Sequence, residues 1–90
     1  MIEREEAKRR AEQYLERKGR TEYSVSKVLD IFEMDFQRPR LLFGPKIDDS
    51  CWVAYLRHPL TVHMIKSSDI VVISKVDGRV LYAGSAHDEG

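Results

Sequence analysis

The chain has 90 residues, of which 42% are hydrophobic and 33% charged, as in an ordinary folded domain rather than a disordered or fibrous chain. Lysine and arginine together number 15, as do aspartate and glutamate, so the formal net charge is zero. A nucleic-acid-binding domain of this size usually carries a basic excess, and no apolar run approaches the roughly 20 residues that span a bilayer. One cysteine excludes an intramolecular disulfide and fits a reducing compartment. We therefore expect a single cytoplasmic domain over residues 1–90 that binds neither nucleic acid nor membrane.

The first predicted element is a helix over residues 2–18. One apolar stripe at helical spacing runs through it, formed by Ala7, Ala11, Tyr14 and Leu15. Glutamates crowd the first turn and basic residues the last, and both complement the helix dipole. Gly19 suits the left-handed position that ends many helices. Because two members of the stripe are alanines, we expect the helix to lie close against a sheet.

Residues 22–36 are predicted to form a long strand, although part of the segment also fits helical spacing. The strand is favoured because three large apolar residues alternate with acidic ones, namely Phe32, Met34 and Phe36. The residues before them alternate in the opposite phase. A continuous strand therefore needs a β-bulge, which we expect near Lys27 or Val28.

Residues 37–50 are predicted to form a loop, because they contain two prolines and a glycine. The loop is longer than most connections inside a small domain. It carries four large apolar residues, Leu41, Leu42, Phe43 and Ile47. Such a loop either packs against its own domain, which we favour, or presents a surface to a partner.

Residues 51–57 are apolar on both faces, which predicts a central strand that ends before Pro59. Residues 60–68 fit either an irregular connection or a short edge strand. Cys51 begins the central strand beside Trp52, a position typical of a small buried apolar residue. Both faces of this strand are therefore expected to pack.

The last two strands are predicted over residues 69–75 and 79–84, around a turn centred on Asp77 and Gly78. An Asp-Gly pair between two β-branched runs is typical of a hairpin, since glycine tolerates a positive φ. The turn is either the two-residue Asp-Gly form or a longer one. We favour the longer form, which starts at residue 74 or 75 and closes with a bulge at Gly78.

These elements together predict an α+β fold. One N-terminal helix packs on a four-stranded, mostly antiparallel sheet that ends in a β-hairpin, because short strands joined by turns pair antiparallel. The helix is expected to cover one face of the sheet. The other face is expected to keep exposed apolar residues that could support a dimer.

No set of residues in the sequence specifies a reaction. Three histidines, His58, His63 and His87, match no known metal-ligand spacing. Cys51 lies beside no glycine-rich turn or helix N-terminus that would activate a thiol. The paired carboxylates occur in the predicted loop and tail, where nothing desolvates them. We therefore expect no catalytic residues, no metal and no cofactor.

The strand that contains Trp52 and the final hairpin together resemble small bacterial proteins of the YrhB-like, or immunity protein 35, type. In such proteins a helix precedes a W-[VF]-x-[FY] strand, and a V-[IV]-x-K-x-[DT]-G-x-V hairpin is followed by G-[ST]. The matching residues here are Trp52, Val53, Tyr55, Val72, Ile73, Lys75, Asp77, Gly78, Val80, Gly84 and Ser85. The chain departs from the pattern at Cys51, where glycine is expected, and at Ser74, where aspartate is common. The hairpin alone is also similar to that of PepSY-type domains.

The resemblance implies a non-catalytic protein-binding module, either an immunity-type protein that caps a cognate toxin or a small chaperone-like module. We expect the partner-binding residues in the apolar loop and the polar tail, namely Leu41, Leu42, Phe43, Ser85, His87, Asp88 and Glu89. Composition alone favours a frayed terminus for the tail. The alternative function is a homodimeric structural or chaperone-like domain of unknown partner.

Overall fold

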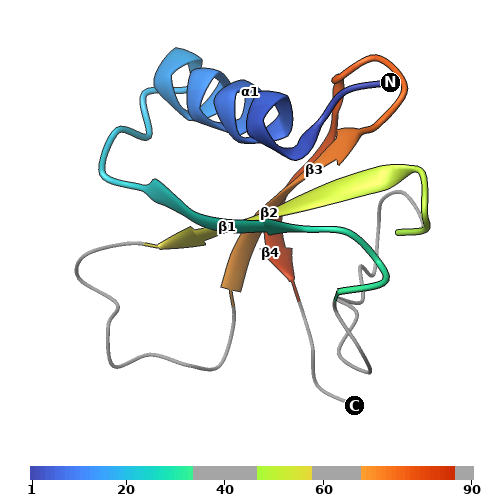
Figure 1. Cartoon of the computed structure of the whole chain (residues 1–90). Helices are drawn as coiled ribbons and strands as arrows, with labels where there is room; N and C mark the ends of the chain where they lie inside the picture. Colours follow the sequence, from blue (N-terminus) through green and yellow to red (C-terminus); the bar gives the residue numbers. More distant parts are fainter. Residues whose placement is uncertain (34–46, 58–67, 87–90) are drawn as a thin grey trace.

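The chain folds as one helix laid across a four-stranded sheet (Figure 1). The computed structural model describes residues 1–33, 47–57 and 68–86. In chain order the elements are α1 (Arg4–Arg17), β1 (Ser24–Leu29), β2 (Cys51–Arg57), β3 (Ser68–Ser74) and β4 (Val80–Ala86). The strands lie in the order β1-β2-β3-β4, and every neighbouring pair is antiparallel. The predicted α+β fold with a terminal hairpin is therefore confirmed.

Helix α1 is slightly shorter than the predicted range 2–18, and glycine ends it as expected. Gly19 has a φ of 71°, in the left-handed region. Its N–H donates to the carbonyl of Glu16, and the N–H of Arg20 donates to the carbonyl of Leu15. These two bonds form a Schellman motif, which satisfies carbonyls that the end of a helix would otherwise leave unpaired.

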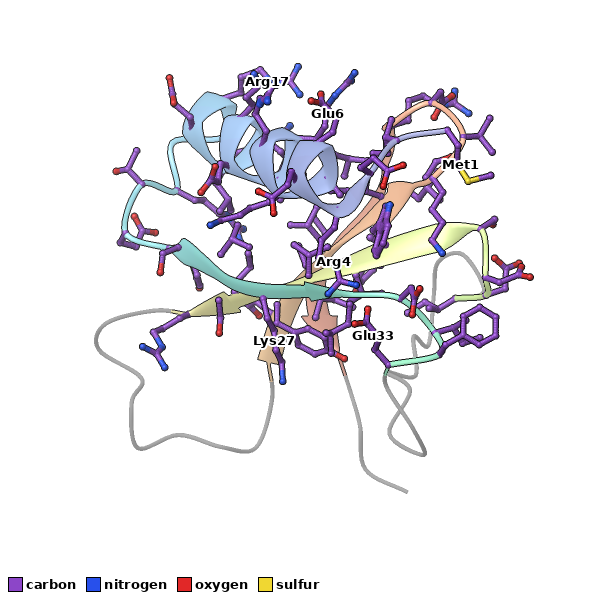
Figure 2. The ribbon with its side chains drawn as sticks, viewed as in Figure 1. Met1, Arg4, Glu6, Arg17, Lys27 and Glu33 are labelled. Atoms are coloured by element: carbon purple, nitrogen blue, oxygen red, sulfur yellow. The ribbon has the colours of Figure 1, made fainter. Side chains whose placement is uncertain are left out.

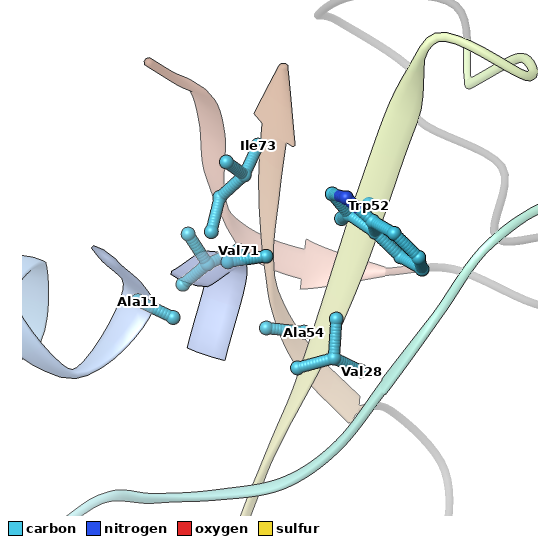
Figure 3. Packing of buried hydrophobic residues seen from close by; sticks show 7 residues of the cluster. Ala11, Val28, Trp52, Ala54, Val71 and Ile73 are labelled. Atoms are coloured by element: carbon cyan, nitrogen blue, oxygen red, sulfur yellow. The ribbon is translucent and has the colours of Figure 1, made fainter. Parts of the chain in front are cut away.

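The core between α1 and the sheet is built on the two alanines of the helix stripe. Ala7 and Ala11 are completely buried. They belong to a cluster whose sheet members are Val28, Trp52, Ala54, Val71 and Ile73 (Figure 3). Because alanine has the smallest side chain that still favours a helix, the helix backbone can lie close to the strands.

Ala11→Leu is expected to lower the free energy of unfolding by about 1–3 kcal/mol, because the larger side chain has no space between α1 and the sheet. Urea denaturation measures the change. Lys8→Leu is the matched control, since it places the same side chain on the exposed side of the helix. If Ala11→Leu and Lys8→Leu had equal stability, the close packing described here would be wrong.

Strand β1 ends at Leu29, so the predicted strand over residues 22–36 is wrong in length. The chain turns at residues 30–33, where the Asp30 carboxylate accepts the N–H groups of Phe32 at 3.0 Å and Glu33 at 3.2 Å. Side-chain bonds of this kind offer the backbone an alternative to a strand ladder. Phe32 is consequently 76% exposed rather than half-buried. Met34 and Phe36 lie outside the described residues.

Two β-bulges interrupt the ladders. In β1 the pairing shifts between Val25 and Lys27, which leaves Ser26 as the extra residue, close to the predicted place. In β4, Val80 and Tyr82 pair with two consecutive residues of β3, so Leu81 between them is the extra residue. A bulge was expected at Gly78, whereas the structure has it at Leu81, inside β4.

The β3–β4 connection is the longer of the two predicted turns. The N–H of Ser74 donates to the carbonyl of Arg79 at 2.8 Å, and the N–H of Gly78 donates to the carbonyl of Ser74 at 2.9 Å. These bonds leave residues 75–78 as the loop, so the two-residue form is wrong. Gly78 has a φ of 78°, a conformation that other residues adopt at a cost. At the hairpin, β3 ends at Ser74, one residue before the predicted end, and β4 begins at Val80, one residue after the predicted start.

A second core occupies the sheet face away from α1. Val53, Ile70 and Val72 are completely buried there, and Cys51 is 2% exposed. The expectation of an exposed apolar face is therefore wrong for the part of the sheet that the structure describes. Both faces of β2 and β3 carry branched apolar residues, and the single chain buries both. Ile47 joins this second core, so this residue of the predicted loop packs on its own domain.

Candidate functional site

An open groove with a volume of about 830 Å³ lies between α1 and the start of β4. One wall is formed by Arg10, Tyr14 and Arg17 of the helix, with Lys18 just after it. Arg79 and Val80 supply the opposite wall. The groove therefore joins the first element of the chain to the last hairpin.

Positive charge dominates the lining. Four cationic side chains line the groove against one carboxylate, that of Glu16, although the formal net charge of the chain is zero. Arg17 lies on the side of α1 turned away from β1 (Figure 2). Within the described part of the chain, neither Arg17 nor Lys18 forms an ion pair, whereas Lys18 Nζ lies 5.7 Å from the centroid of the Tyr14 ring. These two cations remain available to a ligand.

The other two cations of the groove already have carboxylate partners. Arg10 Nε donates to Glu6 Oε2 at 2.9 Å, and this hydrogen bond holds the pKa of Glu6 below its ordinary value. Arg79 Nε lies 3.3 Å from Asp77 Oδ2. The backbone N–H of Arg79 also donates to Asp77, which lowers the pKa of that carboxyl. Both carboxylates are therefore ionised at neutral pH, and they partly neutralise Arg10 and Arg79.

Gly78 shapes the end of the groove. A Cβ placed on this residue would come within 3.1 Å of the Arg10 guanidinium carbon. The missing side chain lets Arg10 lie across the hairpin loop, in reach of the groove. The glycine that permits the turn thus also positions a lining cation.

Strand β4 forms the sheet edge that begins at the groove. It pairs with β3 on one side and with no described residue on the other. None of its residues, VLYAGSA, is charged. The opposite edge strand, β1, carries Lys27 and packs against α1. Since proteins commonly protect exposed edges with charges, β4 is the edge that the described residues leave open to another strand.

Trp52 lies at the centre of a second group of charged residues, at the other end of α1. Its ring centroid is 4.7 Å from Lys75 Nζ and 5.3 Å from the Arg4 guanidinium carbon. Its Nε1–H donates to the carbonyl of Ile2 at 3.2 Å. The indole therefore has a cation near its ring from the helix and another from the hairpin loop.

Both cations near Trp52 are also paired with carboxylates from the turn after β1. Arg4 Nη2 lies 2.8 Å from Glu33 Oε1 (Figure 2), and Lys75 Nζ lies 3.6 Å from Asp30 Oδ2. The Lys75 and Asp30 side chains are mostly buried. This group ties the N-terminus, the β1 turn and the hairpin loop together, so it stabilises the fold.

Tyr23 hydrogen-bonds the Asp69 side chain, and this bond raises the pKa of the phenol. Burial and the negative charge of Asp69 raise that pKa further. The folded-state pKa therefore exceeds the unfolded value of about 10. The resulting stabilisation is fully present below about pH 10 and is lost as the pH rises through the folded-state pKa.

The Tyr23→Phe variant is expected to lose less stability than the wild type between about pH 9 and pH 11, because it lacks the phenol that must ionise. Urea denaturation across this pH range measures the difference. Tyr14→Phe is the control, since the Tyr14 hydroxyl has no hydrogen-bond partner among the described residues. An unchanged pH dependence in Tyr23→Phe would contradict the role of the bond to Asp69.

The structure leaves most of the sequence-predicted partner residues outside its described part. These are Leu41, Leu42, Phe43, His87, Asp88 and Glu89. Ser85 is in β4, opposite Asp69 in the ladder, so its backbone is on the open edge. The predicted set did not include the groove residues, because the helix dipole already accounts for basic residues in the last turn of α1.

Cys51 is buried, with its Sγ 3.8 Å from Asp48 Oδ1. Among the described residues, no three or more histidine, cysteine, aspartate or glutamate side chains are grouped to hold a metal. His58, His63 and His87 lie outside those residues. In the same part of the chain, no helix has the length and apolar character needed to cross a membrane.

No protein-family model matches this chain, and no curated protein or solved structure matches it either. The structure thus defines a small α+β domain with a basic groove beside an open sheet edge.

Proposed function

We propose that this chain is a non-catalytic protein-binding module and that the groove between α1 and β4 is its interface. The observation that carries the proposal is that two available cations, Arg17 and Lys18, share a groove with the start of an uncharged strand whose outer edge pairs with none of the described residues. A sheet edge offers backbone hydrogen bonds to an incoming chain, and nearby charges select which chain enters. Arg17, Lys18 and the first residue of β4, Val80, line the same groove.

The lining of the groove supports binding rather than catalysis. The described residues that form it are arginines, a lysine, a glutamate, a glutamine, a tyrosine, a glycine and a valine. Nucleophilic catalysis needs a nucleophile in hydrogen-bond reach of a base, and among the described residues the side chains of the tyrosine, lysine and glutamate of this lining form no hydrogen bond with one another. The groove is also open to solvent, whereas chemistry on a small substrate needs a site that excludes water.

We further propose that the partner is a toxin, as the resemblance to immunity proteins of the YrhB-like type implies. Several residues that carry this resemblance have structural roles in this chain. Lys75 lies beside the Trp52 ring, Asp77 accepts the Arg79 N–H, and Gly78 takes the left-handed turn position. The pattern therefore supports a scaffold like that of the YrhB-like proteins, and the groove between α1 and β4 supports binding of a protein partner.

Co-expression with the product of the adjacent gene tests this function. We expect a stable complex and relief of growth inhibition if that product is toxic. Arg17→Glu should weaken both effects, whereas Lys8→Glu should not, because Lys8 is an exposed cation of α1 outside the groove. Equal thermal stability of the two variants shows that the loss is not one of folding. Absence of any complex at micromolar concentration would contradict the proposal.

The alternative function, a homodimeric structural or chaperone-like domain, draws support from the same uncharged edge. The β4 strands of two copies could pair edge to edge and join the two sheets into one larger sheet. Sedimentation at micromolar concentration decides between the two functions. A strict monomer removes the homodimer, and a dimer that dissociates when β4 is altered replaces the protein-binding proposal.

A further inference from the structure

We infer that the partner presents an acidic, extended segment, which adds to the sheet beside β4 and places its carboxylates against the cations of the groove. This inference rests on the proposed function and specifies the chemistry of the partner. It follows from the geometry of the edge strand, the spacing of the cations on α1, and the charge that remains unpaired there.

The first step is the shape of the edge beneath the helix. Val80 and Ala83 pair with Ile73 and Val71, both of which belong to the core under α1, so the two β4 residues also face the helix side. Ala83 is small and exposed. The β4 edge therefore leaves room on this side for the side chains of an added strand. Alternate residues of that strand would point toward α1, about 7 Å apart.

The second step is the spacing of the groove cations. Arg10, Tyr14 and Arg17 are four and then three residues apart, so they share one stripe of α1. Arg10 and Arg17 are separated by two turns, which is about 10.5 Å along the helix axis. Acidic residues at alternate positions of an extended chain recur at about 7 and 14 Å, within the reach of flexible arginine side chains.

The third step is the charge that an occupant must supply. Glu6 and Asp77 are already paired with Arg10 and Arg79, which leaves Arg17 and Lys18 without carboxylate partners among the described residues. Strand β4 of a second copy would satisfy the edge but brings no carboxylate of its own to these cations, because Asp88 and Glu89 come only after its last residue. An acidic segment satisfies both, so we choose it over self-association.

The test uses a soluble peptide of about ten residues in which glutamate alternates with threonine or valine, a length that spans the edge strand. Titration into ¹⁵N-labelled protein is expected to shift the amide signals of β4 and of Arg79. The peptide with lysine in place of glutamate should bind at least about ten-fold more weakly. A peptide with alternate backbone nitrogens methylated should also lose binding, because it cannot complete the ladder.

The variants complete the test. Arg17→Glu should weaken binding of the glutamate peptide by about ten-fold or more, and Lys8→Glu by less than about two-fold. Equal binding of the lysine peptide, undiminished binding of the methylated peptide, or no binding at about 1 mM would each overturn the inference. Concentration-dependent shifts of β4 signals without peptide would also overturn it, since the occupant would then be a second copy.

These outcomes separate the inference from the proposed function. If the adjacent-gene product forms a complex that Arg17→Glu does not weaken, the chain is still a binding protein, but the acidic segment is wrong. If no complex forms and no peptide binds, both fail. If the glutamate peptide binds but the adjacent-gene product forms no complex, the inference stands and the partner is another protein.

Discussion

Trp52→Ala is expected to lower the free energy of unfolding by about 3–5 kcal/mol, the largest effect of any single substitution proposed here. The indole is 9% exposed and belongs to the core under α1. Its removal leaves a cavity, deprives Lys75 and Arg4 of the ring beside them, and frees the Ile2 carbonyl. Far-ultraviolet circular dichroism during urea denaturation measures the loss without relying on the indole as a reporter.

Trp52→Phe is the matched control for that measurement. Phenylalanine keeps an aromatic ring beside the two cations but cannot donate to the Ile2 carbonyl. Its smaller ring and the lost hydrogen bond should together give a loss of about 1–2 kcal/mol. A loss below about 1 kcal/mol for Trp52→Ala would show that the indole does not hold the N-terminus and hairpin together.

Ile70→Ala is the second large effect, with an expected loss of about 2–5 kcal/mol. Ile70 is completely buried in the core on the sheet face away from α1. If the single chain buries this face, the loss must be the same at every protein concentration. Urea denaturation at several concentrations measures both the loss and its concentration dependence.

Val76→Ala serves as the control for Ile70→Ala, because Val76 is 69% exposed and its truncation should change stability by less than about 0.5 kcal/mol. A loss for Ile70→Ala that shrinks as the protein is diluted would contradict burial within one chain. The face would then be covered by a second copy, since dissociation exposes it.

The elements with strong local signals were the ones that sequence could predict. The apolar run over both faces, with Pro59 after it, predicted the bounds of β2 correctly, and the Asp-Gly pair located the hairpin. Gly19 marked the end of α1 because its left-handed conformation is a local requirement. In each case a few neighbouring residues determine the backbone.

Predictions failed where a side chain competes with the ladder or where distant segments meet. Alternation suggested that β1 continues past Leu29, but the Asp30 carboxylate captures two backbone N–H groups and turns the chain. The second sheet face was expected to be exposed, because nothing in the spacing shows that Ile47 packs there. Strand alternation identifies which residues share a face but not what covers it.

The groove could not be found from spacing, because its two walls are far apart in sequence. Tyr14 belongs to the predicted apolar stripe and Arg17 to the basic last turn, but neither pattern indicates a groove until the hairpin is placed beside the helix. A cation at Arg79, directly before an uncharged strand, was the only other signal. Arg79 indicates a possible binding surface only when β4 is known to be a sheet edge.

Site-specific photo-crosslinking from Gln13 tests the central claim, that the groove is the interface of a binding protein. Gln13 lines the groove, and Lys8 lies on the same helix outside it, so a photoreactive residue at each position compares the two surfaces directly. In the native host we expect one adduct from position 13, identified by mass spectrometry, that is absent from position 8 and disappears with Arg17→Glu. Adducts of equal yield from both positions, or one that persists with Arg17→Glu, would contradict the claim.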